Sequence, residues 1–198
     1  MSKFNPIIYL SLFFLSVSCN NQQTNQISNE NTLKAKQIPL ENFFKNPEKS
    51  SYQISPNGDY YSFMAPYKNR MNIFVQKRGD TSSVQLTFEE DRDVSGYFWP
   101  NDNQIMFLKD DGGDENYHLF GVNIDGGNLI GYTDFEGVRA QIIDDLPGQD
   151  EFVVVGLNKR NNQVFDPYRL NLISGELTMI AENPGNIQGW MFDHDGKL

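Results

Sequence analysis

Turn-forming clusters recur at a nearly constant interval along most of this chain. Each cluster combines residues such as Pro, Asn, Asp and Gly, which favour tight turns. Successive clusters begin 44, 47 and 46 residues apart. A repeat of about 45 residues built from short β-type runs is typical of a β-propeller, in which each unit is one four-stranded blade. The four clusters are Ser55-Pro56-Asn57-Gly58-Asp59, Trp99-Pro100-Asn101-Asp102-Asn103, Leu146-Pro147-Gly148-Gln149-Asp150 and Phe192-Asp193-His194-Asp195-Gly196.

Apolar and aromatic runs lie in phase between these clusters, four to each unit. They predict an all-β fold, an incomplete β-propeller with about three four-stranded antiparallel blades and the start of a fourth. The alternative is a β-sandwich, which also places strands at intervals of about 8–12 residues. The expected strands are 60–65, 104–108 and 151–157, then 72–76, 117–124 and 168–173, then 86–88, 132–135 and 178–181, and finally 94–99, 138–143 and 187–192, which gives blades at about 52–99, 100–146 and 147–192.

Three blades fall short of a closed propeller. Propellers normally close with about 4–8 blades, so that no sheet edge stays open. We therefore expect residues 38–198 to be a partial propeller, the N-terminal piece of a longer protein.

Residues 1–18 have the pattern of a signal peptide. Lys3 supplies the positive charge, and residues 7–17 form an apolar stretch too short to span a bilayer. Cys19 follows the small Ser18 and is the only cysteine, so no intrachain disulfide is possible. Residues 15–19 resemble a bacterial lipoprotein signal, which implies lipidation of Cys19; an ordinary secretory signal is the alternative.

The segment after Cys19 is rich in Asn, Gln, Ser and Thr. Such a composition cannot bury enough apolar surface to offset the entropy of ordering, so residues 19–37 are expected to be a flexible tether. The predicted location is the cell envelope, with the protein exported, anchored to a membrane by lipid and facing the periplasm. The net charge of −10 argues against nucleic-acid binding, which needs clustered Lys and Arg.

Several stretches resemble known propellers. Ser55-Pro56-Asn57-Gly58 before a strand is found both in the prolyl oligopeptidase family and in TolB-like proteins. Longer stretches are similar to the propeller of bacterial prolyl oligopeptidase family enzymes of the acylaminoacyl and dipeptidyl peptidase type. These stretches are 43–58, Gln85-Leu86-Thr87-Phe88, Asp114-Glu115-Asn116-Tyr117-His118-Leu119, Asn158-Lys159-Arg160, 165–171 and 189–197.

The resemblance implies a two-part serine peptidase that hydrolyses short peptides. In this family the propeller covers the active site of a C-terminal α/β-hydrolase domain and excludes folded proteins. The chain contains no Gly-x-Ser-x-Gly segment, so no catalytic residue is assigned and the chain alone is expected to be inert. Short peptides would be its partners through a catalytic domain beyond this chain, and no cofactor is expected. The alternative is a TolB-like propeller lipoprotein that acts as a non-catalytic binding module.

Carboxylates gather around Gly112-Gly113, where Asp110, Asp111, Asp114 and Glu115 lie close in sequence. Their spacing does not match the EF-hand pattern, so we expect a solvated hairpin connection and no metal site. The resemblance adds another role, since some family members hold the free amino terminus of the substrate with propeller carboxylates. Glu115 is the candidate for that contact.

The two histidines, His118 and His194, are too few for a His-rich metal site. His118 would need a nucleophile on a strained turn to act as a catalytic base, and the sequence offers none. A structural role is expected for both.

Overall fold

The computed structural model describes residues 35–193 and 195–198. The predicted signal peptide, the lipidation site Cys19, most of the tether and His194 lie outside the described residues. The chain divides into two units, Met1–Leu40 and Glu41–Leu198, and the strands found among the described residues belong to the second. A short 3₁₀ helix, η1 (Leu40–Phe43), lies ahead of the first strand. No helix in the described part of the chain is long and apolar enough to cross a membrane.

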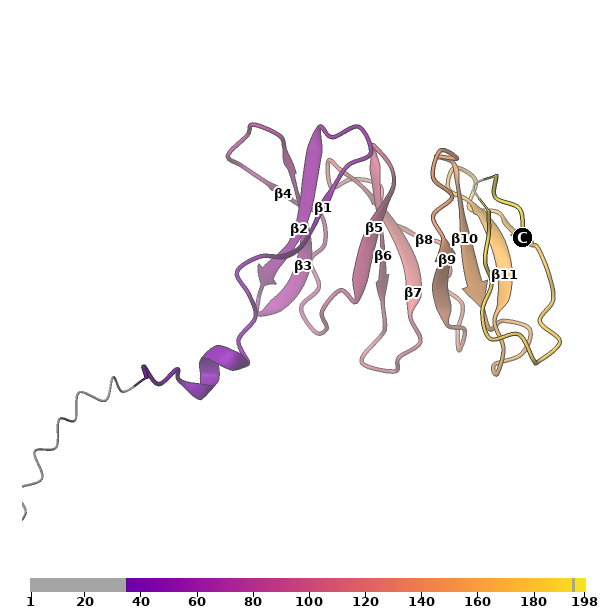
Figure 1. Ribbon diagram of the computed structural model, residues 1–198, viewed down its shortest axis with the longest axis horizontal. Coiled ribbons are helices and arrows are strands. Elements are labelled where there is room, and N and C mark those ends of the chain that lie inside the picture. Colours follow the sequence, from indigo (N-terminus) through magenta and orange to yellow (C-terminus); the bar gives the residue numbers. More distant parts are fainter. Residues whose placement is uncertain (1–34, 194) are drawn as a thin grey trace, which may run out of the picture. The chain divides into compact units, whose positions relative to one another are not determined.

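Three four-stranded antiparallel sheets follow one another along the chain (Figure 1). In each sheet every strand pairs with its neighbours in sequence. The predicted all-β fold with three four-stranded units is therefore confirmed. The first sheet contains β1 (Ser50–Ile54), β2 (Tyr60–Tyr67), β3 (Arg70–Lys77) and β4 (Val84–Gln85); the second contains β5 (Gly96–Asn101), β6 (Gln104–Lys109), β7 (His118–Asn123) and β8 (Ile130–Gly131); the third contains β9 (Ala140–Asp144), β10 (Phe152–Leu157), β11 (Asp166–Asn171) and β12 (Leu177–Met179).

The sheets are offset by one strand from the predicted units of 52–99, 100–146 and 147–192. The run at 94–99, expected to end the first unit, begins the second sheet as β5, where Phe98 pairs with Met106 of β6. The run at 138–143 likewise begins the third sheet as β9. The reason is that a tight turn joins two antiparallel strands that pair with each other, so each turn cluster lies inside a sheet.

The run at 187–192, expected to be a strand, is irregular. By analogy with β5 and β9, its hairpin partner would follow the turn at Gly196. The described residues contain no such partner strand.

The sheets pack face to face, and an apolar core fills each of the two seams between them. The first seam, between the first and second sheets, contains Ile73, Val75, Trp99, Ile105 and Phe107. The second seam, between the second and third sheets, contains Met106, Leu119, Val153, Leu157 and Leu170. Neighbouring residues of β6 serve both seams, because side chains along a strand point alternately to its two faces.

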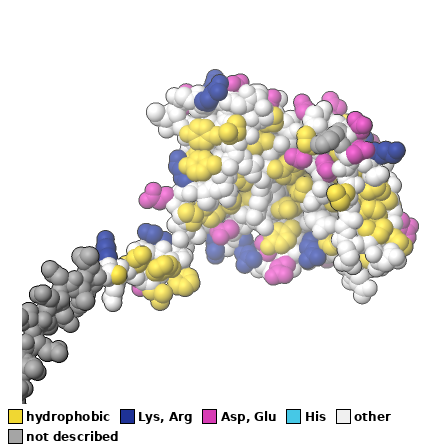
Figure 2. Space-filling view, viewed as in Figure 1, with side chains coloured by type: hydrophobic (Ala, Val, Ile, Leu, Met, Phe, Trp, Pro, Cys, Tyr) yellow, Lys and Arg dark blue, Asp and Glu magenta, His cyan; other side chains and the backbone are white. Residues whose placement is uncertain are grey.

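Not all apolar side chains are enclosed by these cores. On the face shown in Figure 2, hydrophobic side chains reach the surface over the first sheet, and acidic ones lie along the edges and over the right-hand part of the view. In β1, Tyr52 and Ile54 are 57% and 72% exposed. This outer face of the first sheet thus differs from the two covered seams.

Tyr132 ties the second sheet to the third. Its hydroxyl donates to the carbonyl of Leu172 at 2.7 Å and accepts from Gln104 Nε2 at 3.2 Å. The ring lies over Gly121 of β7, where a Cβ atom would come within 2.7 Å of it. A glycine is required there because any side chain would displace the tyrosine.

Candidate functional site

The strand-to-strand turns define two edges of the three sheets. The N–H of Asn57 donates to Asp102 Oδ1 at 2.8 Å, and Asn101 Nδ2 donates to the carbonyl of Asp150 at 2.9 Å. The β1–β2, β5–β6 and β9–β10 turns therefore lie side by side along one edge, the turn edge. The connections 110–117 and 158–165, at the far ends of β6 and β10, consequently lie along the opposite edge, the loop edge (Figure 1).

Glu115 lies on the loop edge, in the connection between β6 and β7. Its backbone has a φ of +58°, a left-handed conformation that is uncommon for residues other than glycine. Its N–H approaches Asp110 Oδ2 at 3.4 Å, while its side chain is exposed. The exposed side chain thus extends from a turn whose backbone contacts the carboxylate of Asp110.

Asp110 is the residue that holds this turn. Its side chain is only 2% exposed and pairs with Arg92 at 3.4 Å. The guanidinium of Arg92 in turn lies against Gly113. A pocket of about 250 Å³ opens beside the pair, between Arg70 and Tyr117. Asp110 is therefore structural, whereas the carboxylates of Asp111 and Glu115 are exposed.

The carboxylate of Asp114, in the same connection, forms local hydrogen bonds. Asp114 accepts from both the side chain and the backbone N–H of Asn116, at 3.0 Å each. The bond from the Asn116 side chain, reinforced by the backbone bond, keeps the pKa of Asp114 below its ordinary value. Among the described residues, no three His, Cys, Asp or Glu side chains are arranged to hold a metal ion.

In each sheet, one side chain near the start of the third strand forms hydrogen bonds to the segment that follows the fourth strand. In the first sheet, Asn72 Oδ1 accepts from the N–H of Glu89 at 2.7 Å, and Nδ2 donates to its carbonyl at 2.9 Å. In the second, His118 Nδ1 lies 2.8 Å from the carbonyl of Thr133. The contact agrees with the structural role predicted for His118.

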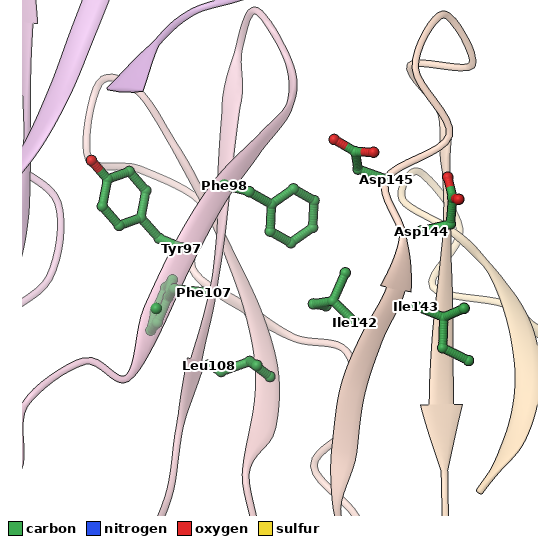
Figure 3. Close-up of a pocket in the computed structure, with 9 residues that line it drawn as sticks. Tyr97, Phe98, Phe107, Leu108, Ile142, Ile143, Asp144 and Asp145 are labelled. Atoms are coloured by element: carbon green, nitrogen blue, oxygen red, sulfur yellow. The ribbon is translucent and has the colours of Figure 1, made fainter. Parts of the chain in front are cut away.

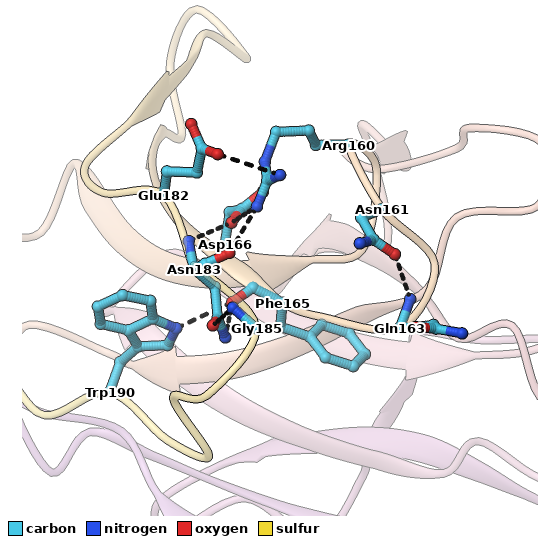
Figure 4. A network of polar contacts seen from close by, with 9 residues as sticks. All are labelled: Arg160, Asn161, Gln163, Phe165, Asp166, Glu182, Asn183, Gly185 and Trp190. Carbon is cyan, nitrogen blue, oxygen red and sulfur yellow. Dashed lines mark hydrogen bonds and ion pairs between the residues drawn. The ribbon is translucent and has the colours of Figure 1, made fainter.

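In the third sheet the same position is occupied by Asp166, which is fully buried (Figure 4). Its two carboxylate oxygens accept from Arg160 Nε and Nη2 at 2.9 and 3.0 Å, and one also accepts from the N–H of Asn183 at 2.7 Å. Arg160 also contacts Glu182 at 3.2 Å. Trp190 Nε1 donates to the carbonyl of Phe165 at 2.9 Å, which fixes the segment after β12 against the 158–165 connection.

These contacts set the charge state of the pair. Burial alone would raise the pKa of Asp166, but the hydrogen bonds from Arg160 and Asn183 and the charge of Arg160 outweigh it, so the pKa lies below its ordinary value. The hydrogen bond to Asp166 raises the pKa of Arg160. The contact of Asp166 with Asn183 was not predicted, because the two residues are 17 positions apart and are brought together only by the fold.

A cleft of about 410 Å³ lies between β5 and β9, at the second seam (Figure 3). Phe98 and Ile142 point toward one another across it, and the carboxylate of Asp145 lies at its turn-edge end. This β5–β9 cleft was not predicted, although the pair Asp144-Asp145 directly after an apolar run was a visible signal. The residues that line it are Gly96, Tyr97, Phe98, Phe107, Leu108, Ile142, Ile143, Asp144 and Asp145.

The structure does not bring Glu115 and the β5–β9 cleft together. Glu115 lies in the loop-edge connection, whereas Asp144 and Asp145 lie beside the β9–β10 turn at the turn edge. The chain therefore presents two separate acidic positions, one at each edge.

Comparison with known proteins gives two relatives in sequence. The chain is 32% identical over 163 residues to dipeptidyl aminopeptidase BIII of Pseudoxanthomonas mexicana, covering 81% of this chain and 24% of that protein. It is 28% identical over 167 residues to dipeptidyl peptidase family member 6 of Caenorhabditis elegans, covering 80% of this chain and 22% of that protein. The chain thus spans about a quarter of the length of these relatives. No protein-family model matches it.

In structure, the chain is similar to an oligogalacturonate lyase solved in complex with manganese. The TM-score is 0.57 at 13% identity, over 81% of this chain and 47% of the lyase. At that identity the likeness concerns the fold alone. The sequence relatives, taken with this fold, support the resemblance to the propeller region of prolyl oligopeptidase family peptidases.

Proposed function

We propose that this chain is the propeller portion of an exported serine peptidase of the prolyl oligopeptidase family that hydrolyses short peptides. The observation that carries the proposal is the 32% identity to a dipeptidyl aminopeptidase along 81% of the chain. The propeller would limit access to the active site and position the substrate. Hydrolysis would belong to an α/β-hydrolase domain encoded beyond this chain.

The exposed carboxylate of Glu115 supports a role in holding the substrate's free amino terminus. An ammonium group and a carboxylate form a charge-assisted hydrogen bond, which is stronger than one between neutral groups. Asp110 and Arg92 hold the turn that carries Glu115, so its backbone would need little further ordering when substrate binds.

The complete protein encoded by the reading frame tests both parts. It should hydrolyse dipeptidyl p-nitroanilides with a free amino terminus, and a serine-directed inhibitor should abolish the activity. A complete protein that lacks a Gly-x-Ser-x-Gly segment and cleaves no peptide would favour the TolB-like binding module instead.

The Glu115→Gln variant addresses the amino-terminal contact. It should lower kcat/KM at least tenfold on free-amino substrates and leave the rate on N-acetylated substrates unchanged. Glu136→Gln is the matched control, because Glu136 is an exposed glutamate in the connection between β8 and β9, also at the loop edge. Equal effects of the two substitutions would remove Glu115 from the proposed role.

The lipid anchor is a separate proposal that depends on Cys19. In cells expressing the protein, a Cys19→Ala form should move from the membrane fraction to the soluble fraction and should no longer incorporate labelled fatty acid. Retention of the variant in the membrane fraction would contradict lipidation at this residue.

A further inference from the structure

We propose that the β5–β9 cleft binds the N-terminal residue of a short apolar peptide, with its side chain between the sheets and its ammonium group at Asp145. The inference rests on the proposed function in one respect: the peptidase would supply the peptide. Binding at the cleft itself requires no hydrolysis. Three properties of the cleft carry it: the apolar walls, the charge at one end, and the absence of the bonds that close the first seam.

The walls are apolar and come from two sheets. Phe98 and Leu108 project from the second sheet and Ile142 from the third, and all three are only partly buried although they pack against the second core. The volume of about 410 Å³ falls in the range of about 300–1,000 Å³ that is usual for small-molecule sites. One large aliphatic or aromatic side chain would bury further apolar surface on both walls.

The charge of the lining is entirely negative. Asp144 and Asp145 are its only ionisable acids or bases apart from the Tyr97 phenol, and in the described part of the chain neither aspartate has an ion-pair partner. Asp144 accepts the N–H of Leu146 at 2.8 Å, whereas Asp145 is exposed and its carboxylate faces the opening. An apolar site with carboxylates at one end favours a ligand with an apolar group and a nearby cation.

The corresponding place in the first seam is closed. There Gln53 Nε2 donates to the carbonyl of Tyr97 at 2.7 Å, and the Tyr97 hydroxyl donates to the carbonyl of Ser51. Among the described residues no side-chain hydrogen bond joins β5 to β9 in the same way. The β5–β9 cleft is therefore a feature of the second seam, and the equivalent strands of the first seam, β1 and β5, do not form one.

The test uses L-phenylalaninamide and N-acetyl-L-phenylalaninamide, which share a side chain and differ in the ammonium group. Titration calorimetry on the complete protein should show at least tenfold tighter binding of the free amine. Hydrogen exchange should show protection by the amine in 96–108 and 140–146. Equal affinity of the two probes, or protection confined to other segments, would overturn the proposal.

Variants separate this site from the proposed peptidase site. Asp145→Asn should weaken binding of the free amine at least fivefold, Asp145→Glu should largely restore it, and the exposed control Asp134→Asn should leave it unchanged. Exchange protection of 96–108 and 140–146 reports on this cleft alone, and Glu115 lies outside both segments, so failure here does not affect the proposal for Glu115. An unchanged affinity in Asp145→Asn, with an unaltered exchange pattern elsewhere, would contradict the site.

Discussion

The two seams of this molecule have the same kind of core and differ in how they are closed. In the first seam, polar contacts lie on the first strands of the two sheets, where Gln53 and Tyr97 bridge β1 and β5. Trp99 adds a buried hydrogen bond from Nε1 to Ser62 Oγ at 2.8 Å. In the second seam, the main polar tie is at Tyr132, which follows β8, and the space between β5 and β9 stays open.

Sheets that repeat the same strand order can therefore be joined by different kinds of contact. Apolar packing is non-directional and needs only matching surfaces, whereas buried hydrogen bonds require particular partners. In the first seam, hydrogen bonds join the first strands of the two sheets, β1 and β5, and close the space between them. Where they lie elsewhere, as in the second seam, a cleft remains that a ligand can enter.

The largest expected effect on the free energy of unfolding comes from Asp166, which lies in neither seam. The substitutions in the two seams are compared with it. Asp166→Ala removes a buried carboxylate that accepts three hydrogen bonds, two of them from Arg160. Loss of these charge-assisted bonds should lower the free energy of unfolding by about 3 kcal/mol. Denaturant unfolding of the complete protein measures it, with the exposed Asp134→Ala expected to change stability by less than about 0.5 kcal/mol.

The same carboxylate should make stability depend on pH in one direction. Because the pKa of Asp166 is lower in the folded protein than its ordinary value near 3.9, its contribution is fully present above about pH 4. The contribution is lost as the pH falls through the lower, folded pKa. When the free energy of unfolding is measured at decreasing pH, it should therefore fall less for Asp166→Ala than for the parent protein. An equal decrease would show that Asp166 does not contribute to the acid sensitivity.

In the second seam, Tyr132→Phe removes the tie between the sheets and leaves the carbonyl of Leu172 and the amide of Gln104 without their buried partner. Buried polar groups left unpaired cost about 2 kcal/mol. Hydrogen exchange should become faster in β11 and β12. Tyr52→Phe is the matched control, since Tyr52 is exposed and should show no change.

The first seam should respond more weakly to Gln53→Ala. The bond to the Tyr97 carbonyl is partly buried, so its loss should cost about 1 kcal/mol and accelerate exchange in β5 but not in β9. Exposed Gln163 offers the control substitution Gln163→Ala. Faster exchange in both strands would mean that the seams are not independent.

The smallest effect is expected from filling the cleft. Ile142→Phe should occupy part of the open space and stabilise the protein by about 0.5–1 kcal/mol. It should also abolish binding of phenylalaninamide. Ile173→Phe, at an exposed position, should do neither. Destabilisation by Ile142→Phe would show that the cleft cannot take a larger side chain.

The sequence allowed prediction of the three sheets because their turn clusters are local and recur every 44 to 47 residues. It did not reveal which strands share a sheet, because counting units from each cluster separates the two strands that the turn joins. An exposed acidic connection around Glu115 was predicted from residues close in sequence. The β5–β9 cleft and the Asp166–Asn183 contact escaped prediction because they depend on how separate strands and segments meet in space.

The pairing of every strand with its sequence neighbours has a consequence for how the protein forms. Each sheet can assemble from short-range hairpins, so little chain entropy is lost in closing its loops. The first sheet needs no residue beyond Gln85 and can be complete while the rest of the chain is still being synthesised. Docking of each new sheet on the one before it then becomes the main long-range step, and errors of assembly would concentrate at the seams.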